Sequence, residues 1–273
     1  MIVNSAVDAN ERMKSSVGRE IGVLQHIRHP LLVGLLSAFE TTDTTHTVIV
    51  LEHVQGGELF DLVSKCHSLF TDEFLRRAID ELQNAVGWMH KLGLVHRDLK
   101  LENILLTTPL FINSSTELPP KTEPMIKITD FGLSRFIDFS SPLLTTRCGS
   151  EEYAAPELIL GKQYDGRRTD VWALGVVIYA LIIGKLPFEG DSRRKMLVKI
   201  AKGVYDWPMK STQKDLKEVV EKMLVREPDS RIKLEDISLN QVWDLEAVGK
   251  RPVEGSDAAR FLAGEILPPT PDS

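Results

Sequence analysis

The pattern of apolar and polar positions in the first part of the chain predicts a helix followed by two strands. Apolar side chains recur at helical spacing over residues 11–28, where they are Val17, Ile21, Leu24 and Ile27. His29-Pro30 ends this helix, and strand-like runs joined by a polar turn follow at residues 31–39 and 47–54. Gly56-Gly57 then breaks the pattern, and we expect a hinge between two lobes at this point.

Beyond the glycine pair the chain becomes mainly helical. Thr71 is a suitable N-cap residue, and the acidic residues that follow it suit the positive end of a helix dipole. This helix is expected to run to about Lys91, with Gly93 as a left-handed cap. A second, almost wholly apolar helix is predicted over residues 171–183.

Two short strands are predicted in the middle of the chain, at residues 104–106 and 125–128. They flank a polar, proline-containing insert, residues 107–124, which we expect to form a surface loop. The tail from about Lys250 has no clear period and ends in a proline-rich stretch, so partial disorder is expected there.

Composition narrows the class of protein. With 273 residues, 42% hydrophobic and 26% charged, the chain can bury a large core in one domain or two lobes. A net charge of −6 argues against broad nucleic-acid binding. Two cysteines and no signal peptide predict a cytoplasmic or nuclear protein. The apolar stretch at 171–184 is shorter than the ~18 residues that a membrane span needs.

Three short motifs follow one another in a characteristic order. Residues 96–103 read HRDLKLEN, residues 130–132 read DFG and residues 155–157 read APE. Protein kinases carry these motifs in this order. The chain therefore resembles a eukaryotic Ser/Thr protein kinase domain of the calcium/calmodulin-dependent kinase-like group, lacking the first N-lobe strands. The resemblance covers about 240 residues.

The resemblance implies an α+β, protein-kinase-like bilobal fold with an incomplete β-rich N-lobe and a mainly helical C-lobe. Residues 1–53 would form the truncated N-lobe, with an αC-type helix and two or more strands. Residues 54–249 would form the C-lobe, with the activation segment at 130–157, and residues 250–273 the tail.

Four residues are expected to carry the chemistry, because phosphoryl transfer depends mainly on positioning and charge neutralisation. By resemblance, Asp98 accepts or orients the proton of the substrate hydroxyl, and Lys100 neutralises the γ-phosphate. Asn103 and Asp130 would hold Mg²⁺ through hard oxygen ligands. Lys100 in this position is typical of Ser/Thr kinases, so tyrosine specificity is not expected.

The resemblance also implies an ATP site. Six residues are expected to surround adenine, ribose and the pocket floor: Leu51, Glu52, Val54, Glu58, Leu105 and Thr129. The first three belong to the strand that pairs with adenine through backbone groups. Glu58 matches the ribose-binding acid, and the last two form the floor.

Regulatory and substrate-binding residues carry over in the same way. Thr146 is at the usual phosphate-accepting position of the activation segment, where an upstream kinase would act, and Arg97 is the expected partner of its phosphate. The neighbouring Thr145 is the alternative acceptor. Glu102 and Ser150 are expected to face the protein substrate.

Several structural contacts are implied as well. Glu157 is expected to pair with Arg231, and Asp170 to bond to the backbone near His96. A stack of side chains linking the lobes is also expected, made of Leu24, Leu35, His96 and Phe131.

The expected phosphate-covering loop is not found in the sequence. Glu20 matches the helix glutamate that pairs with a strand lysine, and the family's spacing places that lysine at about Met1. No G-x-G-x-x-G precedes Glu20, and Lys14 is too close to replace the lysine. We therefore expect two strands and the loop to be absent, through a gene-model error, a deliberate truncation or a short isoform.

These observations predict an ATP-dependent protein Ser/Thr kinase, impaired in this chain by loss of the glycine-rich loop and the strand lysine. Two alternatives remain open: a catalytically weak kinase-like docking module, and a truncated fragment without function. The expected partners are protein substrates with Ser or Thr acceptors, and neither nucleic acid nor a membrane is expected.

Overall fold

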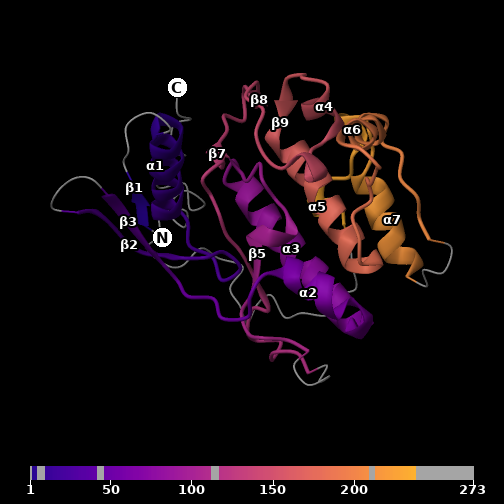
Figure 1. The fold of residues 1–273 in the computed structure, drawn as a ribbon, viewed down its shortest axis with the longest axis horizontal. Helices are drawn as coiled ribbons and strands as arrows, with labels where there is room; N and C mark the ends of the chain where they lie inside the picture. The colour runs from indigo at the N-terminus through magenta and orange to yellow at the C-terminus, as the bar shows by residue number, and fades with distance from the viewer. Residues whose placement is uncertain (1, 5–9, 42–45, 112–116, 209–212, 238–273) are drawn as a thin grey trace.

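The computed structural model describes residues 2–4, 10–41, 46–111, 117–208 and 213–237. A small sheet with one long helix lies on one side of the molecule, and a larger group of helices lies on the other (Figure 1). The predicted polar turn between the first two strands falls mostly outside the described residues, as does the predicted tail.

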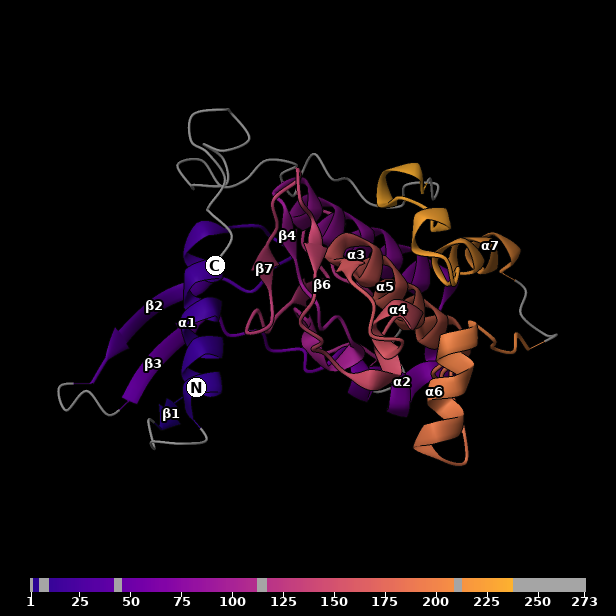
Figure 2. The same cartoon turned by 90° about the horizontal axis from the view of Figure 1, so that it is seen from above.

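The smaller part contains one helix and three strands. They are β1 (Ile2–Asn4), α1 (Asn10–His26), β2 (Leu35–Glu40) and β3 (His46–Leu51). The strands form an antiparallel sheet in the order β1-β3-β2, in which Leu35 pairs with Leu51 and Asn4 with His46. Helix α1 lies beside this sheet and faces the rest of the molecule (Figure 2).

Alternation along β3 identifies the covered face of the sheet. Ile49 is 3% exposed, whereas the next residue, Val50, is 38% exposed, since neighbouring side chains in a strand point to opposite faces. The predicted helix and both strands are confirmed, although β3 ends at Leu51 and not at Val54, and the first strand starts later than predicted. Residues 31–33 precede β2 as buried, irregular chain, and Leu32 forms a single parallel bridge with Ile128.

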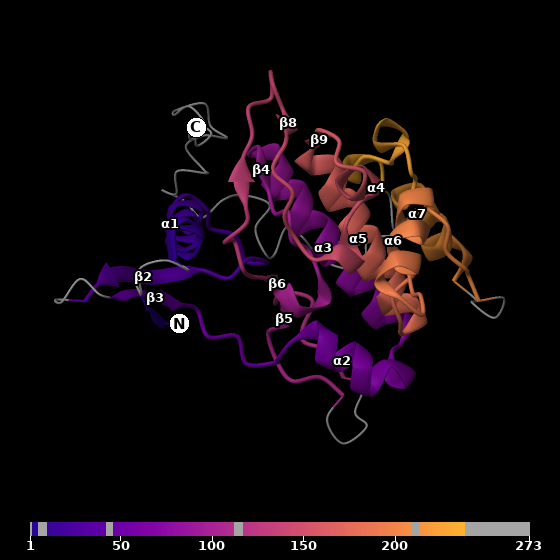
Figure 3. The same ribbon diagram turned by 45° about the horizontal axis from the view of Figure 1, so that its top comes forward.

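The larger part is built around two long helices, α3 (Asp72–Lys91) and α5 (Gly166–Ile183), which pack against each other (Figure 3). Thr71 caps α3 as predicted, because its hydroxyl accepts a hydrogen bond from the Phe74 N–H at 3.1 Å. Helix α5 is buried on almost every side, which explains its apolar sequence, and it ends at Gly184 with a φ of 84°.

The remaining helices and short strands surround this pair. The helices are α2 (Leu59–Cys66), α4 (Pro156–Ile159), α6 (Arg193–Lys202) and α7 (Lys214–Met223). The antiparallel strand pairs are β4 (Leu94–Val95) with β7 (Arg135–Phe136), β5 (Ile104–Leu106) with β6 (Ile126–Ile128), and β8 (Leu143–Leu144) with β9 (Tyr164–Asp165). Single 3-10 turns occur at His67–Leu69, Leu101–Asn103, Glu151–Tyr153, Pro228–Ser230 and Leu234–Asp236. None of the helices within the described residues is both long and apolar enough to span a membrane.

The connection between the two parts is tied to strand β5. The Gly56 N–H donates to the Leu106 carbonyl at 2.8 Å, and the Leu106 N–H donates to the Gly57 carbonyl at 2.9 Å. A Cβ at position 56 would lie 2.4 Å from the carbonyl oxygens of Leu106 and Thr108. Only glycine permits this approach, so the predicted hinge is anchored at its C-terminal end.

Two predicted braces are confirmed. The Arg231 guanidinium donates two hydrogen bonds of 2.7 Å to the Glu157 carboxylate, and both side chains are buried. Asp170, in the second turn of α5, accepts from the N–H groups of His96 and Arg97 at 2.8 and 2.9 Å. The Asp170 contacts fix the start of the loop of residues 96–103 to the central helix α5.

The insert between β5 and β6 lies mostly at the surface and is anchored to helix α3. The buried Arg77 of α3 donates to the carbonyls of Pro119, Pro120 and Glu123 and to the carboxylate of Glu81. At the other end of the insert, Leu110 and Phe111 are 8% and 6% exposed. Most of the described residues of the insert are exposed or half-buried, as expected of a surface loop, but Arg77 and the buried Leu110 and Phe111 tie the insert to the rest of the molecule.

Candidate active site

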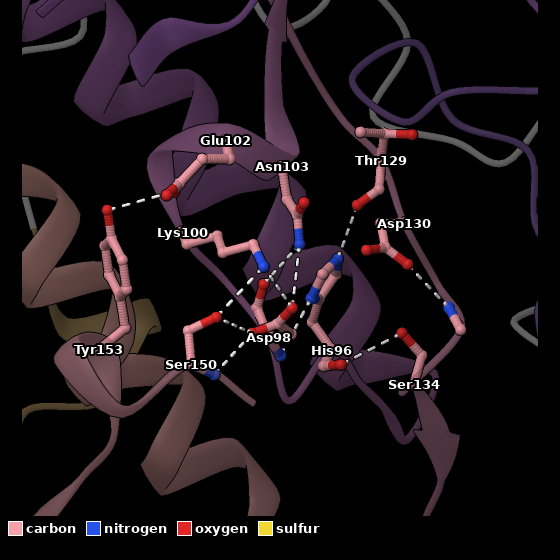
Figure 4. Close-up of polar contacts among 11 residues, drawn as sticks. His96, Asp98, Lys100, Glu102, Asn103, Thr129, Asp130, Ser134, Ser150 and Tyr153 are labelled. Atoms are coloured by element: carbon pink, nitrogen blue, oxygen red, sulfur yellow. Dashed lines mark hydrogen bonds and ion pairs between the residues drawn. The ribbon is translucent and has the colours of Figure 1, made fainter. Parts of the chain in front are cut away.

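The Asp98 carboxylate is the centre of a hydrogen-bonded cluster in the loop after β4 (Figure 4). One carboxylate oxygen, Oδ1, accepts from the backbone N–H and the hydroxyl of Ser150 at 2.9 and 3.0 Å. The other, Oδ2, accepts from the Lys100 ammonium at 2.9 Å. Asp98 is only 8% exposed. These hydrogen bonds therefore hold its carboxylate in one orientation, largely shielded from water.

Lys100 joins this carboxylate to the activation segment. Its ammonium lies 2.9 Å from Asp98 Oδ2 and 3.1 Å from the Ser150 hydroxyl. Although burial disfavours the ammonium, the bond to Asp98 and the charges of Asp98, Glu102 and Asp130 raise the pKa of Lys100 above its ordinary value. The lysine therefore remains positively charged beside the carboxylate.

Asn103 and Asp130 present oxygen atoms on the neighbouring side of the cluster (Figure 4). The Asn103 amide nitrogen donates to the Asp98 carbonyl at 2.8 Å, which leaves the amide oxygen as the potential ligand atom. Asp130 has a φ of 65°, rare for a residue with a side chain, and its Oδ1 accepts from the Gly132 N–H at 3.3 Å. An amide oxygen and a carboxylate are the donor set that suits Mg²⁺.

The expected floor residues lie on the paired strands β5 and β6 and just after them. Leu105 pairs with Lys127 across this ladder. The Thr129 carbonyl accepts a hydrogen bond from the His96 ring at 3.1 Å. The Thr129 N–H donates to the Asn103 carbonyl at 3.0 Å. The backbone of Thr129 is therefore fully used in holding the site together.

The expected adenine-binding segment leads out of β3. Leu51 is the last residue of that strand, and Val54 is half-buried in the connection. Glu52 forms an ion pair with Lys127 at 2.9 Å, and the Glu52 N–H donates to the Gly34 carbonyl at 2.8 Å. Glu58 is exposed at the N-cap of α2.

Glu20 reaches the site from α1. It is 8% exposed. Burial raises the pKa of the Glu20 carboxyl above its ordinary value, and the charge of Asp130 raises it further. Two carboxylates from opposite parts of the molecule therefore approach one another here, an arrangement that a cation stabilises.

Arg97 links the loop of residues 96–103 to the predicted activation segment. Its guanidinium donates to Cys148 Sγ at 3.1 Å and 2.6 Å, and to the Thr146 carbonyl at 3.3 Å. Tyr164 donates its hydroxyl to the same carbonyl at 2.7 Å. The Thr146 side chain itself is exposed. The structure thus brings Arg97 and Thr146 together through a backbone contact.

Several contacts were not predicted from the sequence. Tyr153 donates its hydroxyl to Glu102 at 3.3 Å, and His90 lies 3.0 Å from Asp170. The Lys127–Glu52 pair was also missed. Each of these contacts joins polar residues of common types that are far apart in the chain, so no periodicity or spacing in the sequence indicates that they pair. The expected stack is seen in part, as the His96 and Phe131 rings lie 5.3 Å apart.

Comparison with known proteins agrees with this geometry. The family described as protein kinase domain matches residues 2–243. CBL-interacting serine/threonine-protein kinase 14 of Arabidopsis thaliana is 37% identical over 233 residues, which cover 85% of this chain and 48% of the relative. NUAK family SNF1-like kinase 1 of Mus musculus is 37% identical over 227 residues, covering 83% of this chain and 31% of the relative.

A third relative, the serine/threonine-protein kinase SIK3 homolog of Danio rerio, is 36% identical over 241 residues, or 88% of this chain and 18% of the relative. The chain belongs to the protein kinase family. Its relatives are Ser/Thr kinases of the calcium/calmodulin-dependent kinase-like group, which confirms the resemblance. The chain spans less than half the length of each of them.

Proposed function

We propose that this chain carries the catalytic centre of an ATP-dependent protein Ser/Thr kinase. A substrate hydroxyl oxygen forms a bond to the γ-phosphorus of ATP, the bond from that phosphorus to the bridging oxygen breaks, and ADP leaves with the electron pair. The observation that carries the proposal is the fixed Asp98 carboxylate, which accepts from Lys100 and Ser150 on opposite oxygens.

Asp98 takes the proton of the substrate hydroxyl in this scheme. Its two oxygens are held at 2.9–3.0 Å by their donors, so the carboxylate pays little orientational entropy when the substrate arrives. Lys100, charged and adjacent, offsets the negative charge of the transferring group. Ser150 and Glu102 border the position of the substrate chain, with Glu102 oriented by Tyr153.

Asn103 and Asp130 would hold Mg²⁺. The ion, when bound, supplies charge neutralisation and orientation of the phosphate oxygens. The fit rests on the donor set: the Asn103 nitrogen is committed to Asp98, so its oxygen serves as the ligand, and the Gly132 N–H orients Asp130.

The nucleotide would lie between the two parts of the molecule, over Leu105 and the Thr129 side chain. The N–H of Glu52 bonds to Gly34 and its carboxylate to Lys127, so the group available for adenine is its carbonyl oxygen. Leu51 and Val54 flank this carbonyl along the chain. Glu58 would accept from a ribose hydroxyl.

Thr146 is proposed as the regulatory phosphate acceptor. Arg97 already contacts its carbonyl, and the guanidinium would need only to move from Cys148 Sγ to reach a phosphate on the side chain. Glu20 would support nucleotide binding through a lysine placed between it and the phosphates. Such a cation would also offset the repulsion between the carboxylates of Glu20 and Asp130.

We also propose that the 273-residue chain binds MgATP weakly on its own. The sequence contains no G-x-G-x-x-G, so backbone N–H donors for the triphosphate are lacking while the hinge and metal ligands remain. Titration calorimetry is expected to give an affinity weaker than the low micromolar range. A low-micromolar dissociation constant would show that the loop is dispensable for binding.

The proposed activity is tested by joining the chain at Met1 to a glycine-rich loop and a strand with its lysine. This extended chain is expected to transfer label from γ-labelled ATP to serine and threonine of peptide substrates. Phosphoamino-acid analysis identifies the acceptor. Label on tyrosine alone, or no label at all from a folded protein, would exclude the proposed function.

A further inference from the structure

Two side chains of α1 converge on one backbone carbonyl of the loop after β6. The Ser16 hydroxyl donates to the Gly132 carbonyl at 2.9 Å, and the Arg19 guanidinium donates to the same oxygen at 3.0 Å. Ser16 and Arg19 are three residues apart, so they lie on one face of the helix. These bonds connect α1 directly to the segment that carries Asp130.

The backbone of Gly132 therefore forms hydrogen bonds through both its N–H and its carbonyl. Its N–H donates to Asp130 Oδ1 at 3.3 Å, while its carbonyl is held by α1. Asp130 itself has a φ of 65°. A non-glycine residue in this region is strained, and the conformation persists only where its surroundings hold it in place.

The close approach of α1 explains why a glycine follows Phe131. A Cβ at position 132 would lie 2.6 Å from the Ser16 hydroxyl oxygen, well inside van der Waals contact. A side chain here would displace the Ser16 hydroxyl from its present position, and with it the hydrogen bond to the Gly132 carbonyl.

We propose that Ser16 and Arg19 are positioning residues for Asp130. Their bonds to the Gly132 carbonyl fix the turn whose N–H orients the Asp130 carboxylate toward a divalent cation. Any movement of α1 away from the loop would then loosen the metal ligand. This role rests on the proposed function of Asp130 in binding magnesium.

The chain offers a matched control. Ser15 accepts from the same Arg19 guanidinium at 3.1 Å but is exposed and makes its bond away from Gly132. Ser15→Ala therefore removes a neighbouring hydroxyl without touching the carbonyl. Ser16→Thr and Arg19→Lys keep a donor at each position and serve as rescue variants.

Hydrogen exchange of the 273-residue protein tests the contact without requiring activity. In Ser16→Ala/Arg19→Ala, peptides covering residues 129–136 are expected to exchange about tenfold faster, because two hydrogen bonds that resist opening are lost. Peptides from α5 and the whole of Ser15→Ala are expected to match the wild type. Unchanged exchange at 129–136 in the double variant overturns the proposal.

Binding of Mn²⁺ in the presence of ADP, followed by electron paramagnetic resonance, tests the link to the metal. The double variant is expected to bind Mn²⁺ about tenfold more weakly, with recovery in Ser16→Thr/Arg19→Lys. Faster exchange with unchanged Mn²⁺ affinity shows a structural tie only and overturns the positioning role. If the wild type binds Mn²⁺ no better than Asp130→Asn, the proposed metal site fails, and hydrogen exchange alone decides whether α1 holds the loop.

Discussion

At the residue scale, Arg97 lies where its guanidinium would bind a phosphate on Thr146, as proposed above. Its guanidinium touches the Thr146 carbonyl and Cys148 Sγ, and its own backbone is held by Asp170. A charge-assisted pair with a phosphate would replace a bond to sulfur, which is a weak acceptor, with a much stronger one.

We predict that Thr146→Ala lowers the activity of the extended kinase and that Arg97→Ala removes most of the gain from phosphorylating Thr146. The two losses should be non-additive, because each breaks the same pair. A double-mutant cycle on activity measures this, with mass spectrometry to locate the phosphate. Thr145→Ala is the neighbouring control, and additive effects of Thr146 and Arg97 would reject the switch.

The lowered pKa of His29 predicts that the unfolding free energy depends on pH. Burial, with a smaller effect of the Lys127 charge, lowers the pKa of His29 to about 4, and its ring packs 4.7 Å from Trp88. Since the unfolded chain takes up the proton near pH 6.5, stability is full above that pH and falls as the pH drops toward 4.

Between pH 7.5 and 5, His29 is expected to account for about 2 kcal/mol of lost unfolding free energy. His29→Asn keeps an acceptor for the Leu31 N–H, which now donates to the ring at 3.2 Å, and should remove this slope. Urea unfolding at the two pH values measures it, with the exposed His53→Asn as control. An identical pH slope in wild type and His29→Asn would contradict the assignment.

At the element scale, the insert between β5 and β6 depends on one buried arginine. Arg77 is 1% exposed and bonds to three insert carbonyls and to Glu81, whose other oxygen accepts from the N–H groups of Met125 and Ile126. Burial raises the pKa of Glu81 to about 7, although Arg77 and the two N–H groups oppose the shift. The start of β6 and the part of the insert just before it are thus fixed to α3.

Arg77→Ala is predicted to lower the unfolding free energy by about 3–5 kcal/mol, because it leaves a buried carboxylate and several carbonyls without partners. The adjacent Arg76 pairs with the exposed Asp72 and Asp215, so Arg76→Ala should lose no more than about 1 kcal/mol. Urea unfolding compares the two variants. Equal losses would show that the insert does not depend on Arg77.

Elements were easier to predict than the contacts between them. The capped start of α3, the apolar run of α5 and the short strands on either side of the insert follow from spacing and residue type. The anchoring of the insert by Arg77 does not, because Arg77 is an arginine on a helix and the carbonyls to which it donates belong to no sequence pattern. Helix α2 was also missed, since its eight residues are too short to show a clear period.

The same contrast holds for the site. The motif at 96–103 predicts Asp98, Lys100 and Asn103 together, and the structure brings them within hydrogen-bonding distance of one another or of a shared partner. Ser16 and Arg19 could not be predicted. A serine and an arginine on an amphipathic helix look like ordinary solvated residues, and only the tertiary approach of α1 to Gly132 gives them a partner.

At the scale of the whole molecule, the site is assembled from both parts. Asp98, Asn103 and Asp130 belong to loops fixed on α5 and β6, whereas Glu20, Ser16 and Arg19 come from α1 on the other side (Figure 1). Motion of α1 relative to the helical part would therefore change the environment of Asp130 before it affects Asp98. In the proposed mechanism, Asp98 receives the proton of the substrate hydroxyl, and its carboxylate is held within the helical part by Lys100 and Ser150.

The most direct test is the rate of phosphoryl transfer by the extended chain carrying Asp98→Asn. We predict that kcat falls about 10³-fold with little change in the KM for peptide, because the proton acceptor is lost while the binding surface is kept. The thermal midpoint should stay close to that of the wild type, and Asp229→Asn, at an exposed aspartate, should leave kcat unchanged. A folded Asp98→Asn protein with full kcat would contradict the account.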